Sequence, residues 1–127
     1  MKTLTVTICL TLAVLLGSVG TSWGADFDKG LAAAQSGDFA TALREWTPLA
    51  KQGDADAQFS LGVMYVNGTG VVKDDVYAHL WWSIAASFGD EDASENRDII
   101  AEQMTRVQLK KAKTLAHECV RKKFKGC

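Results

Sequence analysis

The sequence predicts an all-α protein: a short α-solenoid of three helix-turn-helix hairpins, with about six helices, that follows a cleaved signal peptide. The first observation is an internal repeat. When residues 42–57 are shifted by 36 positions onto residues 78–93, seven of the 16 positions are identical. Repeats with a period in the mid-thirties are typical of stacked helical hairpins. The second observation is that apolar residues recur at helical spacing, and no sustained alternation of the kind that marks strands follows the leader.

The first 24 residues have the pattern of an export signal. Lys2 gives a positive start, and residues 4–16 form an apolar stretch of 13 residues. As a helix this stretch would be about 20 Å long, which is shorter than the roughly 30 Å hydrocarbon core of a membrane. Small side chains at the two positions that signal peptidase reads favour cleavage after Gly24. An uncleaved anchor is the alternative. Cleavage leaves residues 25–127, with 13 basic and 15 acidic side chains and two cysteines.

Glycines and N-capping residues divide the remaining chain into six helical segments. At three junctions a glycine is followed directly by an aspartate, the pattern of a helix stop and the cap of the next helix. These junctions are Gly37-Asp38, Gly53-Asp54 and Gly89-Asp90. Asp74 follows a glycine-rich turn, and Thr105-x-x-Gln108 fits a capping box. The expected helices lie near 27–36, 39–51, 55–66, 75–88, 91–103 and 106–124.

The fourth expected helix carries small and aromatic side chains on one face. Its alanines at positions 78, 85 and 86 share the i, i+7, i+8 spacing of a buried face, which Trp82 joins at i+4. We expect these alanines to admit close packing, and Trp81 and Trp82 to fill the space between hairpins. Gly62 is expected to let paired helices approach closely, and Gly68 and Gly70 to adopt positive φ in a turn.

A long motif runs through the middle of the chain. Its residues are Ala57, Leu61, Gly62, Tyr65, Gly68, Gly70, Asp74, Ala78, Trp81, Trp82, Ala85, Ala86 and Gly89. This pattern resembles a complete Sel-one-like repeat (SLR), a relative of the tetratricopeptide repeat, and the resemblance extends over residues 38–127. With the export signal expected at 1–24, the resemblance implies one SLR domain at 25–127. The domain comprises a degenerate first hairpin at 26–53, which lacks the Leu-Gly-x-x-Tyr signature and the Gly-x-Gly-Val loop, a complete repeat at 54–89 and a C-terminal capping hairpin at 90–127.

The two cysteines that remain after export predict a disulfide between Cys119 and Cys127. Eight residues of continuous helix would separate their Cα atoms by about 12 Å, whereas a disulfide requires less than about 7 Å. The last helix must therefore end near Lys123 or Phe124, and Gly126 is expected to help the chain turn back. The alternative is that Cys127 forms an intermolecular bond.

Charge divides the mature chain into an acidic and a basic part. Residues 26–102 hold 5 basic and 14 acidic side chains, whereas residues 105–127 hold 8 basic and 1 acidic. On the last helix we expect a buried stripe made of Ala112, Leu115, Ala116, Cys119 and Val120. The cations left outside are Arg106 and a possible acidic-partner patch of Lys110, Lys113, Arg121 and Lys122. This patch predicts binding to an acidic protein or to an anionic component of the cell envelope; the alternative is a solvated face that caps the open end of the solenoid.

Motifs for catalysis, metal binding or cofactor binding are missing from the sequence. It has no nucleophile elbow, phosphate-binding glycine loop, zinc-spaced histidine pair or C-x-x-C motif. Asp54-x-Asp56 and Asp90-x-Asp92 lack the glycine and glutamate that complete a calcium loop, so we expect helix caps there. His79 and His117 are isolated and are expected to be surface or hydrogen-bonded histidines. We therefore predict no catalytic residue, no metal ligand and no cofactor.

The predicted function follows from the family resemblance and from the charge. A net charge of −1 gives no reason to expect a nucleic-acid partner, and the mature chain is expected to have no transmembrane segment. The resemblance implies a non-catalytic scaffold or adaptor, periplasmic or secreted, that binds another protein in the bacterial envelope. The alternative is binding or hydrolysis of β-lactams or cell-wall compounds, as associated with cysteine-rich exported SLR proteins. A third possibility is a short protein that acts only within a larger assembly.

Overall fold

The computed structural model describes residues 24–127, which form six α-helices and no strand. The predicted signal peptide, apart from Gly24, lies outside the described residues. The helices are α1 Phe27–Gln35, α2 Phe39–Lys51, α3 Ala55–Asn67, α4 Asp75–Ser87, α5 Glu91–Ala101 and α6 Arg106–Arg121. Their ends agree with the expected ends to within three residues, so the all-α prediction is confirmed. Within this part of the chain, no helix has the length and apolar character needed to cross a membrane.

Each helix begins with a side chain that accepts a hydrogen bond from its first turn. The capping residues are Asp26, Asp38, Asp54, Asp74, Asp90 and Thr105. At α6 the predicted capping box is present: the Gln108 N–H donates to Thr105 Oγ1 at 3.1 Å, and the Thr105 N–H donates to Gln108 Oε1 at 2.9 Å. Asp54 and Asp90 therefore serve as caps, as expected, and the side chain of each accepts from the backbone N–H three residues later.

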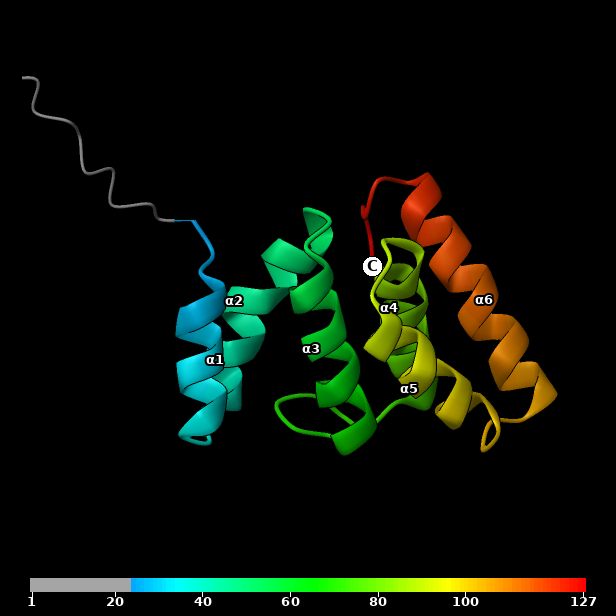
Figure 1. The fold of residues 1–127 in the computed structure, drawn as a ribbon, viewed down its shortest axis with the longest axis horizontal. Helices are drawn as coiled ribbons and strands as arrows, with labels where there is room; N and C mark the ends of the chain where they lie inside the picture. Colours follow the sequence, from blue (N-terminus) through cyan, green and yellow to red (C-terminus); the bar gives the residue numbers. More distant parts are fainter. Residues whose placement is uncertain (1–23) are drawn as a thin grey trace, which may run out of the picture.

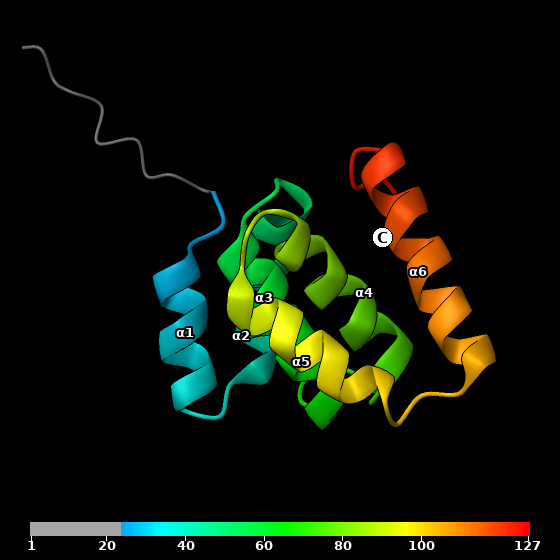
Figure 2. The same cartoon turned by 45° about the vertical axis from the view of Figure 1, so that its right-hand side comes forward.

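The helices pack as two closed hairpins followed by a third pair that stays apart. α1 packs against α2, α3 against α4, and α2 joins the two hairpins through α3. Figures 1 and 2 show α5 and α6 on different sides of α4. Both pack against α4, but they have little contact with each other. The third helix pair therefore differs from a closed hairpin, and its two helices form walls on either side of α4.

The same tertiary contact builds both closed hairpins. In the first, a Cβ atom added to Gly30 of α1 would lie 2.5 Å from Nε1 of Trp46. In the second, a Cβ atom on Gly62 of α3 would lie 2.5 Å from Cδ1 of Trp82. Each indole donates its N–H to the backbone carbonyl three residues before the glycine, at 3.2 Å and 3.1 Å respectively. Glycine is required at both positions because the indole ring occupies the space that a side chain would fill.

The first hairpin thus keeps the central contact of the repeat, although its sequence lacks the Leu-Gly-x-x-Tyr signature. Gly30 precedes Gly62 by 32 residues, whereas Trp46 precedes Trp82 by 36. The difference of four residues lies in the turn between the paired helices, which is longer in the second hairpin. A single shift of the sequence therefore cannot align both helices of the hairpin, and the 36-residue repeat does not reveal Gly30.

The core consists of two clusters that meet at α4. Trp81 lies in the larger cluster, with Leu61 of α3, Ala50 of α2 and Ala116 of α6. Trp82 lies in the smaller cluster, which extends to Ile100 of α5. Adjacent residues on a helix point about 100° apart, so the rings of Trp81 and Trp82 lie on different sides of α4. Trp82 packs against α3 of its own hairpin and shares its cluster with α5 of the next helix pair, whereas Trp81 lies in the cluster that reaches α2 and α6.

The buried stripe of α6 is narrower than expected. Ala112, Ala116 and Cys119 are buried, and Leu115 is partly buried. Val120 is 47% exposed, so its predicted burial is wrong. The physical reason is that α6 packs against α4 and has little contact with α5. The buried residues Ala112, Ala116 and Cys119 therefore form a stripe only about one residue wide, at positions i, i+4 and i+7.

Candidate functional site

The separation of α5 from α6 leaves an open cleft above α4 with a volume of about 310 Å³. Each of the three helices contributes a pair of residues one turn apart, whose side chains share one face of the helix, and α5 also contributes Asp98. The lining residues are His79 and Ser83 from α4, Arg97, Asp98 and Ala101 from α5, and Leu109 and Lys113 from α6. The floor is the buried face of α4, and the walls are the two helices that carry most of the charge of this region.

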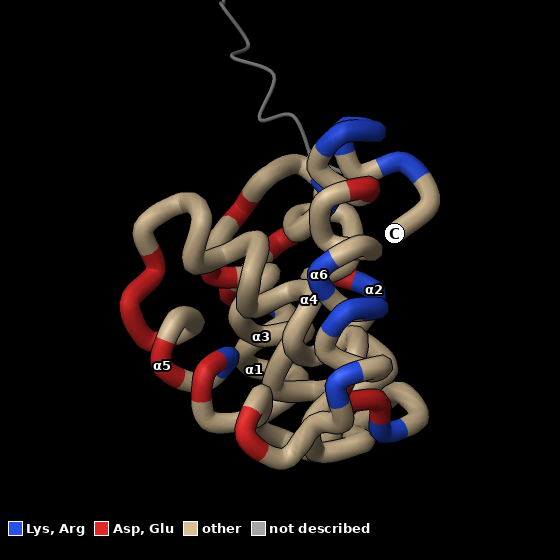
Figure 3. Tube along the Cα trace, turned by 90° about the vertical axis from the view of Figure 1, so that its right-hand side faces the viewer, with Lys and Arg blue, Asp and Glu red and all other residues tan. Residues whose placement is uncertain are grey.

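This cleft, formed by α4, α5 and α6, is called the α4–α6 cleft below. The two helices that form its walls, α5 and α6, have net charges of opposite sign. Figure 3 shows acidic residues along α5 and basic residues along α6 and the C-terminal segment. The exposed acidic residues of this wall are Glu91, Asp92, Glu95, Asp98 and Glu102. Of these acidic residues only Asp98 lines the cleft, next to Arg97, so most of the negative charge of α5 lies outside the cleft lining.

In the third helix pair, charged residues occupy the positions that correspond to the glycine–tryptophan contact of the second hairpin. Counted from the N-cap, Trp46 and Trp82 are each the eighth residue after the cap, and in α6 the eighth residue after Thr105 is Lys113. Gly62 is the eighth residue after the cap of α3, and in α5 the eighth residue is Asp98. The third helix pair therefore has an aspartate and a lysine where the second has glycine and tryptophan. No ion pair joins Asp98 to Lys113 within residues 24–127.

His79 is the buried polar group of the cleft floor. It is 2% exposed, and its Nδ1 atom lies 3.1 Å from Oγ of Ser83, one turn later on α4. Burial lowers the pKa of His79 below its ordinary value, and the positive charges of Arg97 and Lys113 lower it further, against a smaller opposing effect of Asp98. His79 is therefore neutral at pH 7. The signal for this pair in the sequence is the i, i+4 spacing of His79 and Ser83.

The two cations of the cleft differ in their partners. Arg97 is held on α5, where its Nε and Nη2 atoms lie 2.9 Å from Oδ1 of Asp98 and Nη2 also donates to Oγ of Ser94. Lys113 has no hydrogen bond or ion pair with any residue that the structure describes. Because Lys113 lies in the cleft without a protein partner, its ammonium group is available to a bound anion.

The predicted acidic-partner patch is divided by the structure. Arg121 and Lys122 both pair with Glu118, at 2.9 Å and 3.4 Å, and these hydrogen bonds hold the pKa of the Glu118 carboxyl below its ordinary value. Lys110 and Lys113 have no such acid beside them on α6, and together with Arg106 they line a shallow depression next to the cleft. The unpaired cations therefore lie near the start of α6, far along the helix from Arg121 and Lys122.

The disulfide predicted between Cys119 and Cys127 is present, with 5.7 Å between the Cα atoms. α6 ends at Arg121, and positive φ angles at Lys123, Phe124 and Gly126 turn the chain back toward the helix. The bond thus ties the C-terminal segment back to α6, as the prediction of an early helix end required, and Cys127 lies beside Leu80 of α4.

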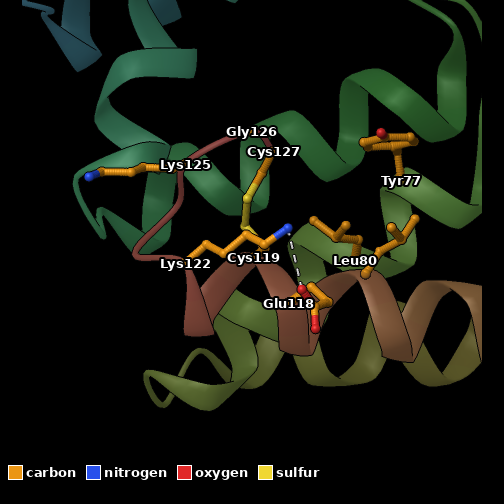
Figure 4. A pocket seen from close by; sticks show the side chains of 9 residues that line it. Tyr77, Leu80, Glu118, Cys119, Lys122, Lys125, Gly126 and Cys127 are labelled. Atoms are coloured by element: carbon orange, nitrogen blue, oxygen red, sulfur yellow. Dashed lines mark ion pairs between the residues drawn. A yellow bond between two sulfur atoms is a disulfide. The ribbon is translucent and has the colours of Figure 1, made fainter.

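A small pocket lies beside this disulfide, between α4 and the C-terminal segment (Figure 4). It has a volume of about 90 Å³, enough for about three water molecules. Figure 4 shows the Lys122 side chain directed at Glu118 rather than free for a ligand. Tyr77 and Leu80 form its apolar side. The pocket is therefore a poorer candidate site than the α4–α6 cleft.

The residues of the repeat motif have structural positions. Ala57, Leu61, Gly62, Ala78, Trp81, Trp82 and Ala85 are buried, while Tyr65 and Ala86 are partly buried. Tyr65 stacks on Tyr77 with 5.3 Å between ring centroids, and Asp74 caps α4. Gly68, Gly70 and Gly89 have positive φ, as expected at turns. In the described part of the chain, His, Cys, Asp and Glu side chains nowhere gather in a group of three that could hold a metal ion.

Comparison with known proteins does not assign the chain to a family. No known protein family matches the chain, and no curated protein sequence matches it.

Proposed function

We propose that this chain is an exported binding module of the SLR type, which attaches to another protein of the bacterial envelope through its C-terminal third. The observation that carries the proposal is the α4–α6 cleft, an open concave surface whose charged walls replace the packing contact of a closed hairpin. Solenoids use such concave surfaces for binding.

Two further features support the proposal. The disulfide between Cys119 and Cys127 suits a protein of an oxidising compartment, which agrees with the predicted export signal. The Gly–Trp contact recurs in both closed hairpins, which agrees with a repeat architecture of the SLR and tetratricopeptide kind. A rigid stack of this kind positions a binding surface without needing catalytic groups.

Affinity capture tests this proposal. The tagged protein is crosslinked in cells of its native host, purified and analysed by mass spectrometry. We expect one reproducible partner, recovered with the wild type and lost when Lys113→Glu reverses the charge of the cleft. The matched control is Lys111→Glu, which changes the same charge on the same helix outside the cleft. Recovery of no specific partner by the wild type would contradict the proposal.

A second candidate function is hydrolysis, and the Ser83–His79 pair favours it. A serine hydroxyl within 3.1 Å of a neutral imidazole, in an open cleft, is the minimal arrangement of a nucleophile and its base. In such a reaction His79 would take the hydroxyl proton at Nδ1 while Ser83 Oγ attacks the carbonyl carbon of a lactam. The ring C–N bond would break, the nitrogen would receive the proton from His79, and water would then hydrolyse the acyl ester.

Turnover of a chromogenic β-lactam by the purified protein tests this second function. A hydrolase would show activity that Ser83→Ala abolishes while the melting temperature stays unchanged. The absence of turnover, or turnover that persists in the Ser83→Ala variant, would exclude Ser83 as a nucleophile for this substrate.

A further inference from the structure

The charges of the α4–α6 cleft converge on one buried group. Arg97 and Asp98 from α5 and Lys113 from α6 all act on the imidazole of His79, each from a wall of the cleft. These groups lie together because α5 and α6 both pack on α4 and keep apart from each other. With His79 neutral, the lining residues carry a net charge of +1.

We propose that this cleft binds the carboxylate of an acidic side chain, a glutamate or aspartate of a partner peptide, between Arg97 and Lys113. The inference rests on the proposed binding function and names the site and the chemical group that is recognised. In the bound state the carboxylate pairs with the ammonium of Lys113, which has no protein partner among the described residues. Its second oxygen faces the guanidinium of Arg97, whose Nη1 atom is not engaged by Asp98 or Ser94.

The charge of the cleft favours a carboxylate over a phosphate. A single negative charge matches the net charge of +1 of the lining residues. A phosphate dianion would leave an excess negative charge beside Asp98, whose side chain is 69% exposed on the α5 wall. The neutral imidazole of His79 adds a hydrogen-bonding group without adding charge, and no described residue occupies its Nε2 atom.

The surroundings of the cleft favour a peptide over a free small anion. Ala101 and Leu109 give it apolar lining that suits the methylene groups of a glutamate side chain. The depression formed by Arg106, Leu109, Lys110 and Lys113 adjoins the cleft and shares Leu109 and Lys113 with it. A peptide anchored by one carboxylate can therefore continue along α6, where two more cations lie without acidic neighbours.

Titration of the isotope-labelled protein with two blocked tripeptides, followed by NMR, tests this inference. The probes are acetyl-Ala-Glu-Ala-amide and its glutamine counterpart, which differ only in the carboxylate. We expect saturable shifts of the Ser83, Arg97 and Lys113 signals with the glutamate peptide, and none with the glutamine peptide or with inorganic phosphate. The bound carboxylate also adds a negative charge near His79, so the pKa of its imidazole should rise.

Two variants and one control complete the test. Lys113→Gln and Arg97→Gln should each weaken binding of the glutamate peptide by about two- to fivefold, as expected for partly exposed ion pairs. Lys111→Gln should leave binding unchanged, because Lys111 does not line the cleft. Equal shifts with both peptides, shifts with phosphate at the same residues, or no shifts up to tens of millimolar would overturn the inference.

Failure of the carboxylate site can be distinguished from failure of the proposed binding function, which the capture experiment tests. If a partner is captured but the glutamate peptide does not bind the cleft, the binding module stands and the carboxylate site is wrong. If the peptide binds and no partner is captured, the carboxylate site stands and the proposed scaffold function fails.

Discussion

Replacing Gly62 by alanine tests the contact on which both closed hairpins depend. The new Cβ atom would lie 2.5 Å from Cδ1 and 2.7 Å from Cε2 of Trp82, so the indole must move. Overpacking of this kind costs about 1–3 kcal/mol. If the indole N–H also loses the Phe59 carbonyl, about 1 kcal/mol is added. Alanine returns about 1 kcal/mol through its higher helix propensity.

The expected net loss is therefore about 2 kcal/mol of unfolding free energy, or about 8–16 °C in melting temperature for a domain of this size. Urea and thermal unfolding followed by circular dichroism measure both quantities. The matched control repeats the change in a Trp82→Leu background, where the clash is gone. There Gly62→Ala should be stabilising by about 1 kcal/mol, which gives a coupling of about 3 kcal/mol between the two sites. Equal effects in the two backgrounds would refute the packing argument.

The remaining predictions concern other parts of the fold. The pKa of His79 is lowered in the folded protein, so below about pH 6.5 the unfolded state binds more protons than the folded state. The unfolding free energy should therefore fall as the pH drops through that window. His79→Gln should flatten this part of a stability–pH profile measured by urea unfolding. Cys127→Ser should lower the unfolding free energy by about 2–3 kcal/mol and speed amide exchange at Phe124. Unchanged exchange at Phe124 would show that the disulfide does not hold the C-terminal segment in place. Glu45 has a pKa lowered by hydrogen bonds from the backbone of Asp26 and from Lys29, so its contribution exists above its ordinary pKa and is lost in acid. Glu45→Gln should speed hydrogen exchange in α1 at neutral pH while α6 is unaffected.

Local signals predicted the helices well because each one has its start and stop in the sequence. The aspartate caps, the capping box at Thr105 and the glycines with positive φ all depend on residues within four positions of one another. The disulfide could also be predicted, because residues 24–127 contain only two cysteines and geometry forbids a continuous helix between them. Such features require no knowledge of how distant segments pack.

The candidate site could not be predicted in the same way. Lys113 was expected as part of a basic patch, but nothing in the sequence places it opposite Asp98 or above His79. Arg121 and Lys122 looked equivalent to Lys110 and Lys113, yet Glu118 pairs with the first two only. Val120 was placed in the core because helical spacing alone does not say how wide a buried stripe must be.

The sequence by itself determined the all-α class, the six helices and the separation of acidic from basic residues, and it predicted the disulfide. These follow from short-range patterns and from counting. Only the tertiary structure decided that the glycine–tryptophan contact recurs in the first hairpin and that the third helix pair stays open as a cleft. The physical reason is that close packing depends on which side chains meet across helices. An indole fits against glycine, whereas the aspartate and lysine at the corresponding positions of α5 and α6 carry charges that favour contact with water or with an ion rather than burial against each other.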